Sequence, residues 1–231
     1  MNFNSSMSKV LIQKRIIATN LRLEGKSYSQ IKKELKVSKS TLSYWLRNYP
    51  LSKNQLNKLV YKNEKRIERF SKTMRLKREK RLSEVYKIEK EELLPLSKKE
   101  IYFGGLFLYW GEGGKTAKTR TAFSNTDPTM IKFTLYWLIK ILKTPTEKII
   151  VRLHLYKDMN INKEMNYWSK MTHLPKNRFR KPYIKNTTLK SLTYKGFGHG
   201  TCNLEIDNRD LKEKIMMGIK VVSDCYARIS W

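Results

Sequence analysis

The chain has 231 residues, of which 49 are Lys or Arg and 20 are Asp or Glu, so its formal net charge is +29. Hydrophobic residues make up 40% and aromatic residues 11%, enough for a buried core, which excludes a disordered basic tail. The longest apolar run is about half of the ~20 residues that span a bilayer, and no signal peptide opens the chain. The short apolar run predicts no membrane partner. Two cysteines, Cys202 and Cys225, are too few for a disulfide framework, so we expect a protein of the reducing cytoplasm.

Positive charge is spread along the whole chain. The net charge is +8 in residues 1–50, +8 in residues 51–100 and +13 in residues 101–231. Solubility requires a net charge of only roughly 2–8 in a small domain. The excess therefore predicts a polyanionic partner, and nucleic acid fits better than an anionic membrane surface. The alternative is a composition that is merely rich in lysine.

Residues 8–50 show the pattern of three short helices. The first ends at Gly25, Ser27 and Ser38 are the predicted N-caps of the second and third, and Pro50 follows the third. Apolar residues of the first helix stand at positions 11, 12, 16, 17, 21 and 23, close to amphipathic spacing. The third helix would present a face to the DNA major groove made of Ser38, Lys39, Ser40, Thr41, Ser43, Tyr44 and Arg47. The alternative is a three-helix unit that contacts proteins.

The string EGKSYSQIKKELKVSKSTLSYWLRN resembles the helix-turn-helix of resolvase and invertase recombinases and of many transposases. The resemblance covers about forty residues and includes both helices, the turn and the inward positions. It implies sequence-specific binding of duplex DNA.

Residues 51–96 are predicted as a basic helical linker of one long helix or two, because the segment has almost no Gly or Pro. Between Lys53 and Arg81 there are 12 basic and 3 acidic residues. Such a helix beside a bound duplex would add salt-sensitive affinity without reading the sequence. A solvated linker would show the same charge pattern.

The last part of the chain has the signals of an α+β domain. Ser97 and Glu100 form a capping box that opens an apolar helix, and Asp127 followed by Pro128 begins another helix. Residues 148–156 alternate between apolar and polar side chains, which is typical of a strand with one buried face. Further strands are predicted at 121–125, 178–185 and 200–207, and further helices at 163–172 and 208–228.

The apolar helix after Ser97 ends in an acid, Glu112, between two glycines. The C-terminus of a helix carries partial negative charge, so a carboxylate there is disfavoured unless a cation lies beside it. A divalent metal ion would relieve this repulsion. The alternative is a surface acid, paired with Lys115.

The run IYFGGLFLYWGEGG and the later FSNTDPTMIKFTLYWLIKIL resemble the LAGLIDADG family of homing endonucleases, over residues 97–231 and with one copy of the motif. Single-motif members of that family act as homodimers, so the resemblance implies a homodimer with a saddle of strands lying along DNA. It implies that Glu112 is the catalytic residue and the ligand of Mg²⁺ in hydrolysis of phosphodiester bonds. Relatives of this fold that do not cleave DNA act as transcription regulators, which is the alternative function.

Several basic residues of this part are candidates for contact with DNA phosphates. They are Lys115, Lys118 and Arg120 after the apolar helix, and Lys181 and Lys185 in a predicted strand. Together the features predict a double-stranded DNA-binding protein of the nucleoid, with RNA as a weaker alternative.

Overall fold

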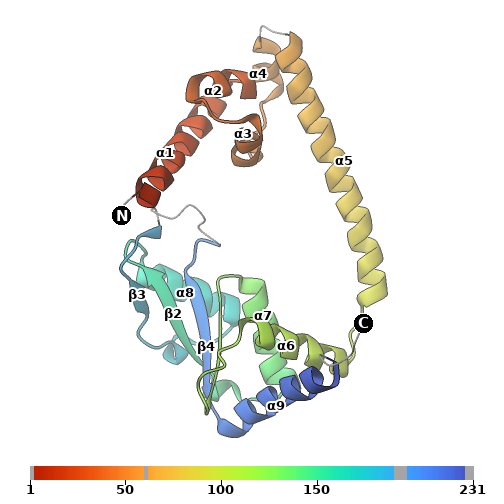
Figure 1. The fold of residues 1–231 in the computed structure, drawn as a ribbon, viewed down its shortest axis with the longest axis vertical. Helices are drawn as coiled ribbons and strands as arrows, with labels where there is room; N and C mark the ends of the chain where they lie inside the picture. Colours follow the sequence, from red (N-terminus) through yellow and green to blue (C-terminus); the bar gives the residue numbers. More distant parts are fainter. Residues whose placement is uncertain (1–2, 60–61, 190–196, 227–231) are drawn as a thin grey trace. The chain divides into compact units, whose positions relative to one another are not determined.

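The computed structural model describes residues 3–59, 62–189 and 197–226, and the chain divides into two compact units, Met1–Leu94 and Pro95–Trp231 (Figure 1). The side chains of residues 3–9 and 62 lie outside this description. Among the described residues, no helix is long and apolar enough to cross a membrane.

Three packed helices begin the first unit: α1 (Phe3–Leu23), α2 (Tyr28–Leu35) and α3 (Lys39–Leu46). The predicted caps are confirmed, because Ser27 Oγ accepts from Gln30 N at 3.2 Å and Ser38 Oγ accepts from Thr41 N at 3.1 Å. Gly25 has a φ of +97°, a conformation that favours glycine after a helix. The buried core consists of Ala18, Leu21, Ile31, Val37, Leu42 and Leu46.

The apolar pattern of α1 predicts more burial than the structure shows. Leu11, Ile16, Ile17 and Leu23 are exposed. The physical reason is length: α1 has 21 residues and its two neighbours have eight each, so, among the side chains of α1 that the structure describes, Ala18 and Leu21 alone belong to their common buried core.

The basic segment that follows consists of two helices, α4 (Lys53–Lys58) and α5 (Lys62–Leu93). Ser52 and Gln55 form a capping box at the start of α4. In α5, Glu64 and Glu68 are buried, whereas every side chain from residue 69 onward is exposed except the half-buried Arg75.

The second unit has the predicted α+β class. Its helices are α6 (Lys98–Glu112), α7 (Pro128–Tyr136), α8 (Ile161–Thr172) and α9 (Arg209–Tyr226), and its strands are β1 (Arg120–Asn125), β2 (Ile150–Tyr156), β3 (Tyr183–Lys185) and β4 (Thr201–Asp207). A π-helical turn, Trp137–Ile141, continues α7. The capping box of Ser97 and Glu100 and the cap at Asp127 are confirmed. Positions 227 and 228 of the predicted last helix lie outside the described residues.

The strand predicted at 178–185 is correct only at its end. Residues Lys176–Arg178 form a 3₁₀ turn, Phe179 makes a single bridge to Val151, and pairing with β2 begins at Tyr183. Pro182 lacks an amide hydrogen and so gives no ladder bond just before that point. Lys181 therefore precedes the strand instead of lying within it.

The four strands form one sheet in the order β1-β4-β2-β3, with only the β2–β3 pair parallel. Phe123, Leu204 and Val151 are in register on three neighbouring strands and are buried in the core with residues of α6, α7, α8 and α9. The helices thus cover one face of the sheet, and the opposite face is polar and half-exposed.

Helix α6 lies flush against the π-helical turn because it has glycine at position 105. A Cβ at Gly105 would lie 2.2 Å from Trp137 Cγ, closer than atoms can approach. Trp137 is itself only 1% exposed. This contact fixes where α6 runs and hence where its last residue, Glu112, is placed.

Candidate nucleic-acid interface

Helix α3 buries Leu42 and Leu46 and turns a polar face outward. Of the residues predicted on that face, Ser38, Lys39, Ser40, Ser43, Tyr44 and Arg47 are exposed and Thr41 is half-buried. The Arg47 guanidinium lies 5.2 Å from the centre of the Tyr44 ring. A short helix with hydroxyls at its N-terminus and a cation at its C-terminus can contact phosphates and base edges.

The end of α6 is held by two lysines. Lys212 of α9 is 2% exposed, and its Nζ donates to Tyr109 Oη at 3.0 Å and to the carbonyl oxygen of Gly114. Lys115 Nζ donates to the carbonyl oxygen of Gly113 at 3.2 Å. Glu112, the last residue of the helix, is exposed. The turn after the predicted catalytic acid is therefore fixed by positive charge.

These lysines bear on the prediction of a metal site. Mg²⁺ takes oxygen ligands in octahedral geometry, and carboxylates are its preferred protein ligands. At the end of α6 one chain offers the carboxylate of Glu112, and lysines already occupy the carbonyl oxygens of Gly113 and Gly114. Among the described residues, no group of three or more His, Cys, Asp or Glu side chains could hold a metal ion. The residues of one chain do not fit a magnesium ion at this place.

The polar face of the sheet is organised around Glu205 of β4, whose side chain is 13% exposed. Asn203 Nδ2 donates to Glu205 Oε1 at 2.6 Å, and Arg152 Nε lies 3.4 Å from the same oxygen. The predicted DNA contact Arg120 pairs with Asp207 at 2.9 Å and lies 3.8 Å from Glu205 Oε2. Sequence reasoning missed Arg152 and Asn203, although the alternation of β2 marks position 152 as outward.

The other predicted basic contacts fall into two places. Lys115 and Lys118 line a pocket of about 500 Å³ together with Arg209 and Lys212. Lys185 belongs to β3, and its Nζ lies 4.7 Å from the Tyr156 ring on the polar face of the sheet.

His154 lies on the same face of the sheet and contacts Tyr183 edge-on, with 5.5 Å between ring centres. Partial burial lowers the pKa of His154 below its usual value, and the nearby charges of Lys185 and Arg152 lower it further, against an opposing effect of Glu205. The main cause of the lowered pKa is therefore the removal of the imidazole from water.

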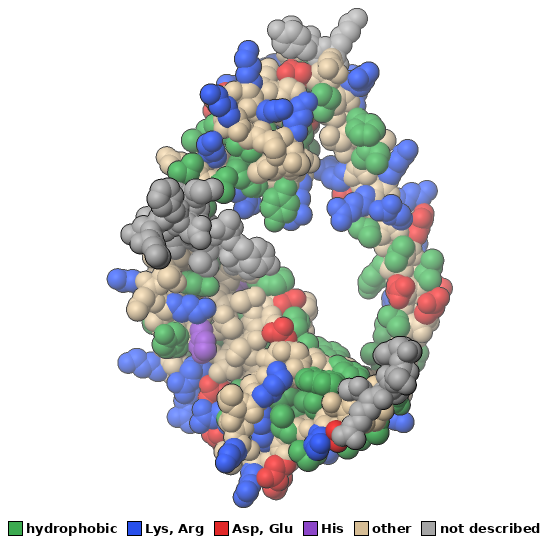
Figure 2. All heavy atoms as spheres, in the orientation of Figure 1, with side chains coloured by type: hydrophobic (Ala, Val, Ile, Leu, Met, Phe, Trp, Pro, Cys, Tyr) green, Lys and Arg blue, Asp and Glu red, His purple; other side chains and the backbone are tan. Residues whose placement is uncertain are grey.

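A stripe of aromatic side chains and glycines runs along the outer side of α6. Phe103, Phe107 and Trp110 stack in a row, with ring centres 6.3 and 6.2 Å apart. Gly104 and Gly111 are exposed next to them, and open space surrounds Gly111. Hydrophobic side chains gather over α6 and α9 in Figure 2. This α6 stripe suits an apolar partner surface.

Comparisons with known sequences and structures identify no relative of this chain. The chain matches no protein-family model, no curated protein and no solved structure. Each candidate surface is therefore interpreted from its own residues: the outward face of α3 in the first unit, and the polar face of the sheet and Glu112 beside the α6 stripe in the second.

Proposed function

We propose that the protein binds double-stranded DNA sequence-specifically, with α1–α3 acting as a helix-turn-helix and α3 as its recognition helix. The observation that carries this proposal is the division of α3 into a buried side, Leu42 and Leu46, and an exposed side of hydroxyl and basic residues. A net charge of +8 over residues 1–50 favours an anionic partner for that side. Such a protein would work at the nucleoid.

The second unit would add a second DNA surface and make the protein a homodimer. In this proposal the polar face of the sheet is the saddle of a LAGLIDADG-like domain, and Arg120, Arg152 and Lys185 meet phosphates. The α6 stripe would pack against the same stripe of a second copy. Its small residues allow close approach of two helices, and its aromatic residues would be removed from water.

The second candidate function is cleavage of the bound DNA as a homing-type endonuclease. The observation that favours it is the exposure of Glu112 at the end of the α6 stripe, where two copies would each contribute one carboxylate. A shared Mg²⁺ would supply Lewis-acid activation of a phosphodiester. The alternative, a regulator that binds without cutting, is favoured by the two lysines at the same helix end, because they neutralise it without a metal.

One experiment separates these functions. The full chain is mixed with a pool of randomised duplexes, with Mg²⁺ or with EDTA, and the bound and cut fractions are sequenced. Enrichment of one sequence that Arg47→Ala weakens or broadens supports the recognition helix; no enrichment refutes specific DNA binding.

Cutting is tested in the same pool. Cleavage that needs Mg²⁺ and disappears in Glu112→Gln, while binding is retained, supports the endonuclease. The control Glu147→Gln changes an exposed acid outside the helix end and should leave both activities intact. Enrichment without cutting supports the regulator.

A further inference from the structure

Helix α5 carries its positive charge at one end. Residues 62–81 hold ten basic and three acidic side chains, a net +7, whereas residues 82–93 hold two basic and four acidic ones, a net −2. Figure 2 shows this division, with Lys and Arg on the part of α5 next to α4 and acidic and hydrophobic side chains on the far part. A helix that serves only as a connection needs no such division, so the basic half requires its own explanation.

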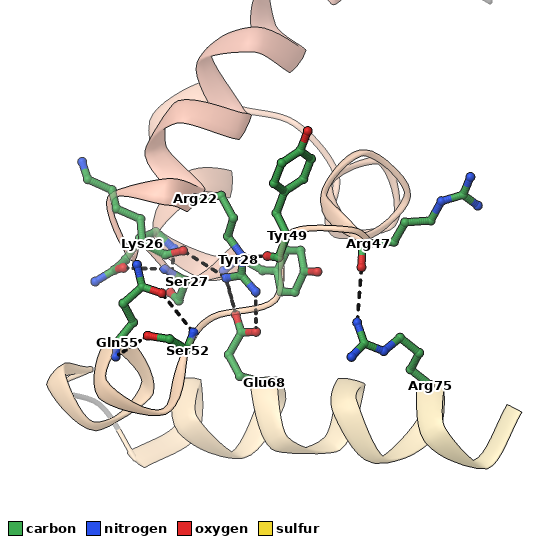
Figure 3. A network of polar contacts seen from close by, with 11 residues as sticks. Arg22, Lys26, Ser27, Tyr28, Arg47, Tyr49, Ser52, Gln55, Glu68 and Arg75 are labelled. Atoms are coloured by element: carbon green, nitrogen blue, oxygen red, sulfur yellow. Dashed lines mark hydrogen bonds and ion pairs between the residues drawn. The ribbon is translucent and has the colours of Figure 1, made fainter. Parts of the chain in front are cut away.

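The basic half is fixed to the three-helix unit by a buried ion pair (Figure 3). Arg22 of α1 and Glu68 of α5 meet through two contacts, Nη2–Oε2 at 2.7 Å and Nη1–Oε1 at 2.9 Å, and their side chains are 2% and 6% exposed. Arg22 also donates to the carbonyl oxygens of Lys26 and Tyr49, and Tyr28 N donates to Glu68 Oε1. Because a buried charge left without its partner is costly, this network selects one placement of α5 against α1 and the turn after α3.

This placement creates a groove between α5 and α3. Arg75 Nη1 donates to the carbonyl oxygen of Arg47 at 3.4 Å, so the two helices approach each other at the C-terminus of α3. The groove has a volume of about 630 Å³. Ser43 and Arg47 line one wall, and Lys72, Arg75, Arg78 and Arg81 line the other. The one acidic residue in its lining, Glu68, is already paired with Arg22.

The geometry points to this groove as a binding site for the sugar-phosphate backbone of the DNA strand that borders α3. The inference rests on the proposed function and extends it, because it makes the basic half of α5 part of the DNA-binding head. Guanidinium groups on both walls, with the ammonium group of Lys72 on one of them, match the spaced negative charges of a phosphodiester chain. Contacts of this kind fix the position of a protein on the duplex and carry no sequence information.

The test is the salt dependence of affinity, measured with the full chain on the duplex selected above. The groove variant is Lys72→Ala, Arg78→Ala and Arg81→Ala together, three exposed cations that are free of the buried network. The matched control removes the same charge from the same half of α5 through Lys65→Ala, Arg66→Ala and Arg69→Ala, which line a different hollow.

Each phosphate contact contributes about 0.9 to the slope of log K against log[salt], which at ~0.15 M salt is roughly a fivefold difference in affinity. We expect the groove variant to lose two to three phosphate contacts, which is about 1.8–2.7 units of slope, and to bind about 30- to 150-fold more weakly at that salt concentration. Its preferred sequence should stay the same. The control should lose less than about one unit of slope.

The outcomes separate the two proposals. Equal losses in both variants would mean that only net charge matters, and would overturn the groove while leaving DNA binding intact. A groove variant whose slope of log K against log[salt] equals that of the wild type would also overturn the groove while leaving DNA binding intact. A wild-type chain that selects no duplex would refute the proposed function, and the groove as a duplex site with it. If the groove variant loses affinity for single-stranded RNA but not for duplex DNA, the groove binds RNA and the proposal of a DNA site is overturned.

Discussion

Replacing Glu68 by Gln tests the buried network that holds α5 to the three-helix unit. The substitution keeps the shape of the side chain but leaves the Arg22 guanidinium buried without its counter-charge. Breaking a buried ion pair from one side costs about 3–5 kcal/mol. Arg22 keeps its bonds to the carbonyl oxygens of Lys26 and Tyr49, so we expect the lower end, about 3 kcal/mol. That is a large fraction of the ~5–15 kcal/mol that stabilises a typical domain.

The readout must resolve the first unit from the second. Hydrogen–deuterium exchange followed by mass spectrometry does so, because peptides from α1, α2 and the start of α5 should exchange faster while peptides from β4 keep their protection. The control is Glu79→Gln, which breaks an exposed pair of Arg75 and Glu79 at 3.6 Å. That pair should contribute less than about 1 kcal/mol, and its loss should leave the exchange pattern unchanged.

The proposed DNA binding gives a second readout of the same variant. Glu68→Gln raises the net charge by one, so electrostatic attraction alone would strengthen binding to DNA. If Glu68 instead positions the basic half of α5, affinity should fall although no cation has been removed. Unchanged protection of α1 and α2, or tighter binding of DNA, would refute the positioning role of the pair.

Other predictions concern the second unit. Gly105→Ala should destabilise it by about 1–3 kcal/mol in thermal unfolding, because the added Cβ meets Trp137 at 2.2 Å. The neighbouring Gly104→Ala, with its nearest contact at 3.4 Å, should not be destabilising, and equal losses at both positions would contradict the packing account. Phe107→Glu places a charge in the α6 stripe, so it should raise the dissociation constant of the proposed dimer at least ~100-fold in analytical ultracentrifugation. A wild-type chain that is monomeric in the same experiment would refute the packing of two α6 stripes. The pKa of His154 is lower in the folded chain than in the unfolded chain, so the unfolded state binds more protons and the free energy of unfolding should fall as the pH drops through the usual histidine range. In urea titrations, His154→Gln should remove that part of the pH dependence. A pKa of His154 at or above the usual value in an NMR titration would contradict this prediction.

Local signals in the sequence were sufficient to place the starts of three helices. Ser27, Ser38 and Ser97 were predicted as N-caps from the residue type and its position before an apolar repeat, and each accepts the expected backbone amide. The alternation of residues 148–156 also predicted a strand with one buried face, and β2 alternates between buried and half-buried side chains as expected. These features depend on residues within a few positions of each other, where spacing alone fixes geometry.

Features that depend on distant residues were outside the reach of the sequence. The pair of Arg22 and Glu68 joins positions 46 apart, and the contact of Lys212 with Tyr109 joins positions 103 apart. Nothing in the local sequence around these four residues distinguishes them from their neighbours. The exposure of Ile16 was missed for the same reason, because burial depends on where α2 and α3 end.

The end of α6 shows how such a distant contact changes a functional interpretation. From the sequence, an acid at the C-terminus of an apolar helix suggested a metal ion. In the fold, Lys212 and Lys115 bring positive charge to that end, so Glu112 needs no metal to be tolerated there. An endonuclease therefore requires a second copy to complete its acid pair, whereas a regulator does not. If the proposed dimer cleaves DNA, splitting it with Phe107→Glu should abolish cleavage outright but only weaken DNA binding, since each copy keeps its own α3.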